Sequence, residues 1–320
     1  MRLVHRSSAV MKEGKRPGKG ESPMELCGRE LRFRGSLIRI AHIDGEGYQF
    51  LENPEAAVGA LRTLRHGIDV FTFIQKLSET APLYSFPMEL DNFAALRVTT
   101  FDDWMSHTIN FKARNKVRKA AKCGVSVREV AYDDEFVRGI SQIYNESPVR
   151  QGMRFWHYGK DIETVRKING TFPDRSIYIG AFYEGTMIGF VKLVTDENRG
   201  QAGLMQILSM IQHRDKAPTN ALVAQAVRSC ADRGIPYLWY ANITYGKKGE
   251  DSLAEFKRHN GFQKLEIPRY YVPLTIAGRI ALRFGLHRSL LEWVPAPMTA
   301  TYRKVRGFWY ARKLPDLKNA

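Results

Sequence analysis

The sequence lacks any run of eighteen apolar residues, so no segment has the composition of a membrane-spanning helix. Cysteine is scarce as well: Cys27, Cys123 and Cys230 are odd in number and far apart, which fits a reducing compartment and gives no zinc-site spacing. The eight histidines are scattered, so we expect no metal site. The first residues are basic but have no apolar core or small-residue cleavage site, so we expect a cytoplasmic protein without a secretory signal.

Positive charge is what the chain has in excess. Its 320 residues include 49 Lys and Arg against 33 Asp and Glu, a formal net charge of +16. Such a chain attracts polyanions, for example phosphorylated cofactors, RNA or an anionic membrane surface. The cations gather in the N-terminal tail, in residues 112–122 and in residues 269–313, where Glu292 is the only acidic residue. A solvated helix face is the alternative for residues 112–122, because charge runs often only face water.

Composition divides the chain into four segments. The first, residues 1–30, is rich in Gly, Lys, Arg, Ser and Pro, which predicts a basic disordered tail, and Met24 opens the first foldable stretch. Residues 31–124 form a smaller unit that ends in a basic helix, and residues 125–274 form a larger one. Residues 275–320 form a basic amphipathic extension, which suits a membrane surface or a partner unless it packs back on the second unit.

Hydrophobic periodicity gives the order of elements in both units. In the first unit we expect strands at 36–40 and 68–74, a helix after Asn53-Pro54, and one helix from about 100 to 124. The second unit alternates strands with helices in a defined order. We expect a strand at 125–130, helices at 133–145 and 160–168, strands at 176–183, 186–194 and 204–211, a helix at 218–233, a strand at 237–243, a helix at 251–260, and strands at 262–267 and 270–274.

Residues 204–222 combine a buried strand, a short charged loop and the start of a helix. Pro218 fits the first helical position, where its missing N–H costs nothing. A helix N-terminus next to Arg214 and Lys216 attracts an anion such as pyrophosphate. An ordinary strand-to-helix connection with a solvated loop is the alternative.

This order of elements resembles the GNAT-type N-acyltransferase fold, a mixed, mostly antiparallel twisted sheet flanked by helices. The segment Ser252–Phe262 is similar to the helix-turn-strand motif of that family, which ends in Gly-Phe. The resemblance implies acyl-coenzyme A as co-substrate, held between splayed strands at 204–211 and 237–243, and no metal. The residues that it assigns to the co-substrate are Ile207, Leu208, Ser209, Met210, His213, Arg214, Asp215, Lys216, Ala217, Pro218, Thr219, Asn220 and Asn242. The family loop usually reads Arg/Gln-x-x-Gly-x-Gly/Ala, whereas residues 213–218 contain no glycine.

The first unit extends the resemblance. A helix containing Trp104 and ending in a basic run, placed directly before a complete GNAT-like unit, resembles the join between the paired halves of Fem-type peptidyltransferases. We therefore expect a smaller, degenerate GNAT-like half before the complete one. Fem-type enzymes take amino acids from aminoacyl-tRNA, so tRNA becomes a candidate partner. Their long helical hairpin arm has no counterpart in this sequence.

Acyl transfer to an amine needs a deprotonated nucleophile, donors for the oxyanion and an acid for the leaving group. Glu146 and His157 are the candidate bases, and Tyr245, just after a strand, is the candidate acid. The residues that suit recognition of an anionic or aromatic acceptor are Arg150, Arg154 and Trp156. Each of these side chains has a structural alternative, as a helix end, a packed ring or a solvated cation.

Three hypotheses follow. The first is a cytoplasmic transferase that moves an acyl group, typically acetyl, from acyl-coenzyme A to a small-molecule or peptide amine by direct attack. The second is a Fem-like transferase that uses aminoacyl-tRNA. The third is a non-catalytic anion-binding protein on a decayed transferase fold, at RNA or peripherally at the inner membrane face. The sequence leaves the acceptor, the acyl group and the oligomeric state open.

Overall fold

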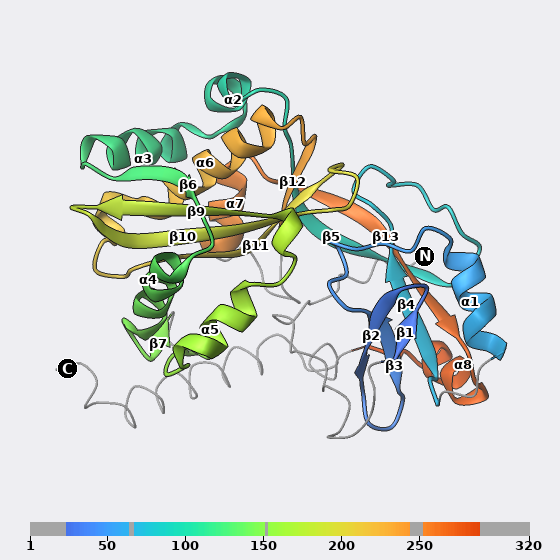
Figure 1. The fold of residues 1–320 in the computed structure, drawn as a ribbon. Helices are drawn as coiled ribbons and strands as arrows, with labels where there is room; N and C mark the ends of the chain where they lie inside the picture. The colour runs from blue at the N-terminus through green and yellow to red at the C-terminus, as the bar shows by residue number, and fades with distance from the viewer. Residues whose placement is uncertain (1–23, 64–66, 151–152, 244–251, 289–320) are drawn as a thin grey trace.

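The computed structural model describes residues 24–63, 67–150, 153–243 and 252–288 (Figure 1). One mixed, mostly antiparallel sheet runs through the molecule in the strand order β1-β2-β3-β4-β13-β5-β12-β11-β10-β9-β6. Its strands are β1 (Glu25–Leu26), β2 (Arg29–Arg34), β3 (Ile40–Ile43), β4 (Val70–Ile74), β5 (Met88–Arg97), β6 (Ser126–Val130), β9 (Ser176–Tyr183), β10 (Thr186–Thr195), β11 (Ala202–Ser209), β12 (Tyr237–Asn242) and β13 (Gln263–Pro273). A separate short hairpin is formed by β7 (Val149–Arg150) and β8 (Met153–Arg154).

Helices cover both faces of this sheet. They are α1 (Pro54–Thr63), α2 (Phe101–Asp103), α3 (Phe111–Lys122), α4 (Asp134–Asn145), α5 (Ile162–Asn169), α6 (Pro218–Asp232), α7 (Ser252–His259) and α8 (Ile276–Arg283). A π-helical turn η1 (Trp104–Thr108) and two 3₁₀ turns, η2 (Pro173–Arg175) and η3 (Arg214–Lys216), complete the elements. In Figure 1, α6 and α3 lie on one face of the larger half of the sheet, and α4 and α5 lie on the other. Among the described residues, no helix is long and apolar enough to cross a membrane.

Side-chain caps explain where several helices begin. Asp133 accepts a hydrogen bond from the N–H of Phe136 at 2.8 Å, and Asp161 accepts one from Thr164 at 2.8 Å. These caps supply partners for N–H groups that the first helical turn leaves unpaired. The helix predicted at 133–145 is therefore confirmed, and it buries the apolar face expected from its spacing: Phe136, Ile140, Ile143 and Tyr144.

Four predicted elements were wrong in detail. The strand predicted at 36–40 is a turn in which Leu37 is 94% exposed, and β3 begins only at Ile40. The helix predicted at about 100–124 is interrupted after the turn η1, because Asn110 caps a new helix. The two strands predicted at 262–267 and 270–274 are the single strand β13. The long strand β5 was not predicted at all.

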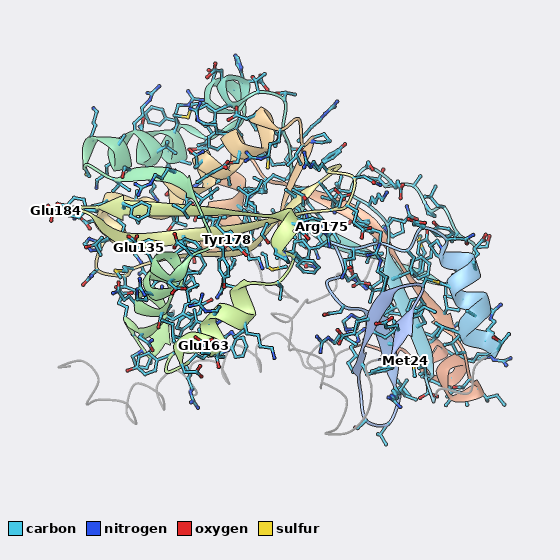
Figure 2. The ribbon with its side chains drawn as sticks, viewed as in Figure 1. Met24, Glu135, Glu163, Arg175, Tyr178 and Glu184 are labelled. Carbon is cyan, nitrogen blue, oxygen red and sulfur yellow. The ribbon has the colours of Figure 1, made fainter. Side chains whose placement is uncertain are left out.

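β5 joins the two halves of the molecule. It pairs antiparallel with β12 on one side and with β13 on the other. A strand from the first unit thus lies between two strands of the second, and the boundary expected at residue 124 is crossed by a continuous sheet. Arg175, labelled near the join in Figure 2, donates to the carbonyls of Tyr48 and Thr195 at 2.7 and 3.2 Å. The Tyr48 ring also packs on Trp239, with centroids 4.9 Å apart.

β11 and β12 separate after a short paired stretch. Their parallel pairing consists of Ala202 opposite Leu238 and Gly203 opposite Trp239. Beyond these pairs the two strands share no ladder within the described residues. This is the divergence expected of the strands predicted at 204–211 and 237–243, and we call it the splay.

The packing of α8 provides a test of the fold. A Cβ added at Gly278 would lie 2.0 Å from the carbonyl oxygen of Asp69, so α8 is pressed against backbone there. We expect Gly278→Ala to lower the free energy of unfolding by about 1–3 kcal/mol, because backbone cannot yield to the new methyl group. Gly59→Ala in α1, where nothing lies within 4 Å, is the matched control and should stabilise by about 0.5–1 kcal/mol. Urea unfolding of both variants makes the comparison; equal stabilities would contradict the packing.

Candidate functional site

The backbone of β11 is irregular where it passes the splay. Lys192 of β10 pairs with Gln206, but the next residue, Leu193, pairs with Leu204, so Met205 is the extra residue of a β-bulge. Bulges disrupt the ladder locally and are common next to active sites. On its other side the same stretch has no ladder with β12. The middle of β11 therefore offers backbone groups to a ligand that enters the splay.

Buried polar side chains gather at the open end of β12. Lys257 is completely buried, and its Nζ donates to the carbonyl of Asn242 at 2.6 Å. Nearby, Asn220 in the first turn of α6 donates to the side chain of Asn260 at 3.3 Å. The Nδ2 of Asn242 is buried and has no partner among the described atoms. A buried amine and an amide N–H without a partner at one place can stabilise a negative charge that develops on a substrate.

Glu146, a predicted base, holds the loop between β11 and α6. Its two carboxylate oxygens accept hydrogen bonds from the N–H groups of Ile211 at 2.7 Å and Gln212 at 2.9 Å. Arg150 donates to the same carboxylate at 2.9 Å, and both side chains are nearly buried. The carboxylate thus connects the end of α4 to the start of the loop.

The loop also uses most of its remaining N–H groups internally. Those of Arg214, Lys216 and Ala217 donate to carbonyls of the loop at 3.1 Å each, which forms the turn η3. Pro218 has no N–H, and the N–H of Asn220 donates to Ala217 at 3.2 Å. Few backbone donors remain for a phosphate at this helix N-terminus.

Arg150, predicted to bind an acceptor, is engaged within the chain. Besides Glu146 it donates to the carbonyls of Ser209 and Ile143, both at 2.8 Å. Arg154, in contrast, is exposed on β8, and Trp156 is 52% exposed with the ammonium of Lys160 over its ring at 3.3 Å. Of the three predicted acceptor residues, Arg154 and Trp156 are the ones that a ligand can reach.

His157, the second predicted base, is buried against β11. Its ring lies 4.3 Å from that of Tyr144, and its Nε2 is 3.3 Å from the amide nitrogen of Gln206, which can donate to it. Burial, reinforced by the charge of Lys160, lowers the pKa of His157 to about 4. The imidazole is therefore neutral at pH 7 and is a weak base.

Sequence reasoning missed Lys192. This lysine of β10 is 1% exposed, and its Nζ donates to the carbonyl and the hydroxyl of Thr171 at 2.5 and 2.7 Å. Burial lowers the pKa of Lys192 to about 7. The signal was a lone cation inside the apolar run Gly189–Val194. Lys257 is also a cation at an apolar position, because it lies three residues after Ala254 on the buried face of α7.

The fold of this chain resembles solved structures, although its sequence matches no known family. No protein-family model matches the chain, and no curated protein matches it. FemX superposes with a TM-score of 0.55 at 11% identity, over 79% of this chain and 86% of that chain. L-PGS from Bacillus licheniformis superposes with a TM-score of 0.51 at 13% identity, over 88% and 87%. A tandem GNAT protein from the clavulanic acid biosynthesis pathway gives 0.44 at 14% identity, over 77% and 79%.

The fold is GNAT-like. Its likeness to FemX confirms the Fem-type resemblance of the fold seen in the sequence. At these identities the likeness concerns the fold alone, so the donor and the reaction remain to be argued from the site.

Within this GNAT-like fold the residues predicted for the co-substrate fall into two groups. Ile207 and Leu208 are partly buried against the main core, Met210 is buried, and the hydroxyls of Ser209 and Thr219 lie 2.8 Å apart. The charged part of the loop faces outward. Arg214 and Asp215 are exposed, Lys216 pairs with Asp215 at 3.3 Å, and His213 lies against the ring of Tyr183. Tyr245, the predicted acid, lies outside the described residues, and its role stays a prediction.

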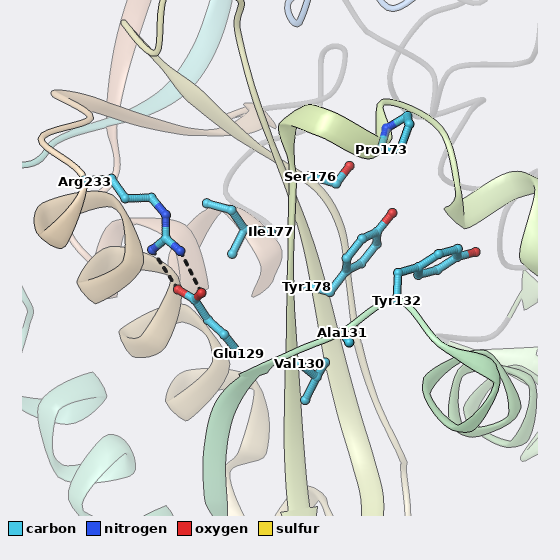
Figure 3. Close-up of a pocket in the computed structure, with 9 residues that line it drawn as sticks. All are labelled: Glu129, Val130, Ala131, Tyr132, Pro173, Ser176, Ile177, Tyr178 and Arg233. Atoms are coloured by element: carbon cyan, nitrogen blue, oxygen red, sulfur yellow. Dashed lines mark hydrogen bonds and ion pairs between the residues drawn. The ribbon is translucent and has the colours of Figure 1, made fainter.

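A pocket of about 290 Å³ lies elsewhere, at the C-terminal end of α6 (Figure 3). Its charged groups satisfy each other, because the guanidinium of Arg233 makes two hydrogen bonds with Glu129, at 2.7 and 2.8 Å. The pocket contains no predicted site residue, and it lies at the opposite end of α6 from the splay. In the described ranges, no cluster of His, Cys, Asp and Glu could hold a metal ion.

The buried Lys192 should make the stability of the protein depend on pH. Between its folded pKa of about 7 and the ordinary value of 10.5, the unfolded chain holds one more proton than the folded chain. The free energy of unfolding should therefore rise with pH in this window, by up to about 1.4 kcal/mol per pH unit. Lys192→Met should remove that rise, whereas Lys167→Met, at an exposed position of α5, should keep it. Urea unfolding at several pH values tests this, and parallel curves for wild type and Lys192→Met would contradict it.

Proposed function

We propose that the chain is a transferase that moves an aminoacyl group from aminoacyl-tRNA to an amine, with the acyl end of the donor in the splay. The observation that carries this proposal is that most backbone N–H groups of the loop after β11 already donate hydrogen bonds within the chain. The N–H groups of Ile211 and Gln212 bind Glu146, and the following turn uses its own N–H groups. GNAT enzymes that use coenzyme A place its pyrophosphate at this loop.

The charged side chains at the loop also argue against coenzyme A as the donor. The carboxylate of Glu146 is 13% exposed and adds a negative charge at the loop, balanced by Arg150. When the family pattern Gln-x-x-Gly-x-Ala is laid on residues 212–217, its first glycine becomes Asp215. A second carboxylate and a side chain thus stand where a glycine would let phosphate approach the backbone. Pyrophosphate would meet two carboxylates that are already paired and few free backbone donors.

The basic helix α3 supplies a surface for a longer polyanion. It packs along α6 and reaches η3, so it lies beside the loop (Figure 1). Its exposed cations, none of which pairs with a carboxylate among the described residues, are Lys112, Lys116, Arg118, Lys119 and Lys122. Phe111 at its start is 70% exposed, as suits stacking on a base. Phosphates spaced along a nucleic acid match such a row of charges.

The reaction would proceed by direct attack. A neutral amine attacks the ester carbonyl carbon of the aminoacyl group, the new C–N bond forms, and the C–O bond to the ribose breaks. The amine loses a proton, and the ribose oxygen gains one. We assign the charge that develops on the carbonyl oxygen to the neighbourhood of Lys257 and Asn242. Glu146 is assigned to holding the loop, because both of its oxygens already accept hydrogen bonds.

Binding of charged tRNA tests the role of α3. Wild type should bind with a steep salt dependence, and Lys116→Ala/Arg118→Ala should flatten the slope of log K against log salt by about 1–2, because two phosphate contacts are lost. Filter binding over a range of KCl concentrations measures it. Arg138→Ala/Lys167→Ala, which removes two exposed cations from α4 and α5 on the opposite face, should leave the slope unchanged. An equal decrease of the slope in both variants would mean that tRNA binds through overall charge and not through α3.

Acetyl-coenzyme A separates this proposal from the second candidate, transfer of an acetyl group, which the splay itself favours. We expect no heat on titration and no change in Tm, because the loop offers too few donors for pyrophosphate. Charged tRNA should raise Tm in the same buffer. Isothermal titration calorimetry and thermal unfolding supply both readings. Micromolar binding of acetyl-coenzyme A would overturn the proposed donor and support the acetyltransferase.

A further inference from the structure

Helix α8 and the residue after it expose three large apolar side chains, whereas Leu282 packs inward. Small residues, Gly278 and Ala281, form its buried face. Ile276 is 71% exposed, Ile280 49% and Phe284 62%, at a spacing of four residues that puts them in one row. A helix that only packed on the sheet would turn such residues inward. This arrangement leaves an apolar ridge in contact with water.

The ridge is held rigidly. The hydroxyl of Thr275 caps the N–H of Gly278 at 3.0 Å and donates to the carboxylate of Asp69 at 2.6 Å. After the helix, His287 and Arg288 contact the carboxylate of Glu89 in β5 at 3.0 and 2.8 Å. Both ends of α8 are therefore anchored to the sheet, and the exposure of the ridge is not the result of a frayed helix end.

Two exposed arginines lie next to the ridge on α8. Arg279 and Arg283 are exposed and each precedes a ridge residue. The helix contains no acid, and no carboxylate within the described ranges pairs with these two arginines. Apolar side chains flanked by guanidinium groups match a surface that is apolar inside and negatively charged outside.

A second segment brings another apolar residue to the same corner. Leu37, in the turn between β2 and β3, is 94% exposed. Its neighbour Ile38 and Leu282 of α8 pack on one small cluster, so the turn lies beside the helix (Figure 1). The carboxylate of Asp69, which binds Thr275, also accepts the N–H of Arg39 at 2.9 Å. One residue thus fixes both segments.

We propose that this corner, Leu37 with Ile276, Arg279, Ile280, Arg283 and Phe284, docks on the surface of an anionic lipid bilayer. The net charge of +16 attracts the chain to such a surface, and the ridge then enters the boundary between headgroups and acyl chains. A fluid lipid surface accepts a convex ridge without a complementary pocket. The proposal does not depend on which donor the transferase uses.

Vesicle sedimentation of the full-length protein tests the proposal. Wild type should bind vesicles of phosphatidylglycerol and phosphatidylcholine more tightly than vesicles of phosphatidylcholine alone. Ile280→Ser/Phe284→Ser should weaken binding to both by about tenfold or more, because two large side chains no longer leave water. Arg279→Ala/Arg283→Ala should reduce mainly the preference for the anionic vesicles, by about tenfold. All four side chains are exposed, so the variants should fold.

Two controls keep the outcome specific. Leu83→Ser/Ile162→Ser removes large exposed apolar side chains elsewhere and should leave vesicle binding unchanged. Ile280→Ser/Phe284→Ser should bind charged tRNA as wild type does, so a failure here is separate from a failure of the proposed function. Unchanged vesicle binding by Ile280→Ser/Phe284→Ser, or no vesicle binding by wild type, would overturn the proposal. So would a wild-type dimer that this variant dissociates in analytical ultracentrifugation, because the ridge would then face a second copy.

Discussion

The structure depends on the position of β5 between β12 and β13. Without this strand the sheet would end at β12 on one side and at β13 on the other, and the two halves would share only side-chain contacts. Asp91 in β5 also pairs with the buried Arg269 of β13, whose guanidinium contacts Glu46 at 2.7 Å as well. Glu89 in the same strand anchors the segment after α8. One strand thus positions the splay, through β12, and the exposed ridge of α8.

Most of the second half could be predicted from the sequence because its local signals agree with its packing. Asp133 and Asp161 cap helices, Glu184-Gly185 turns between β9 and β10, and Pro218 begins α6. β5 could not be predicted in this way. Its sequence MELDNFAALR mixes acids with small residues and shows no alternation typical of a strand. The strand is formed by pairing with β12 and β13, which follow it in the chain by more than a hundred residues. No local pattern reports such partners.

The splay was predictable from the sequence, but the contacts around it were not. The order of elements located the splay and the loop before α6, yet the bonds from Glu146 to Ile211 and Gln212 join residues 65 and 66 positions apart. Nothing in the sequence near Glu146 distinguishes a loop-holding carboxylate from a base. Lys192 and Lys257 were visible only as charges at apolar positions, and such positions become informative once burial is known.

The pairing of β5 also has a consequence for synthesis of the chain. Ala95 in β5 pairs with Trp239, which the ribosome adds 144 residues later. At roughly 5–20 residues per second, the first half would wait on the order of ten seconds with both edges of β5 unpaired. Exposed strand edges can pair with other chains, so this interval favours capture by a chaperone or by another nascent chain. The strand that unites the finished protein is therefore the segment that needs most protection while the protein is being made.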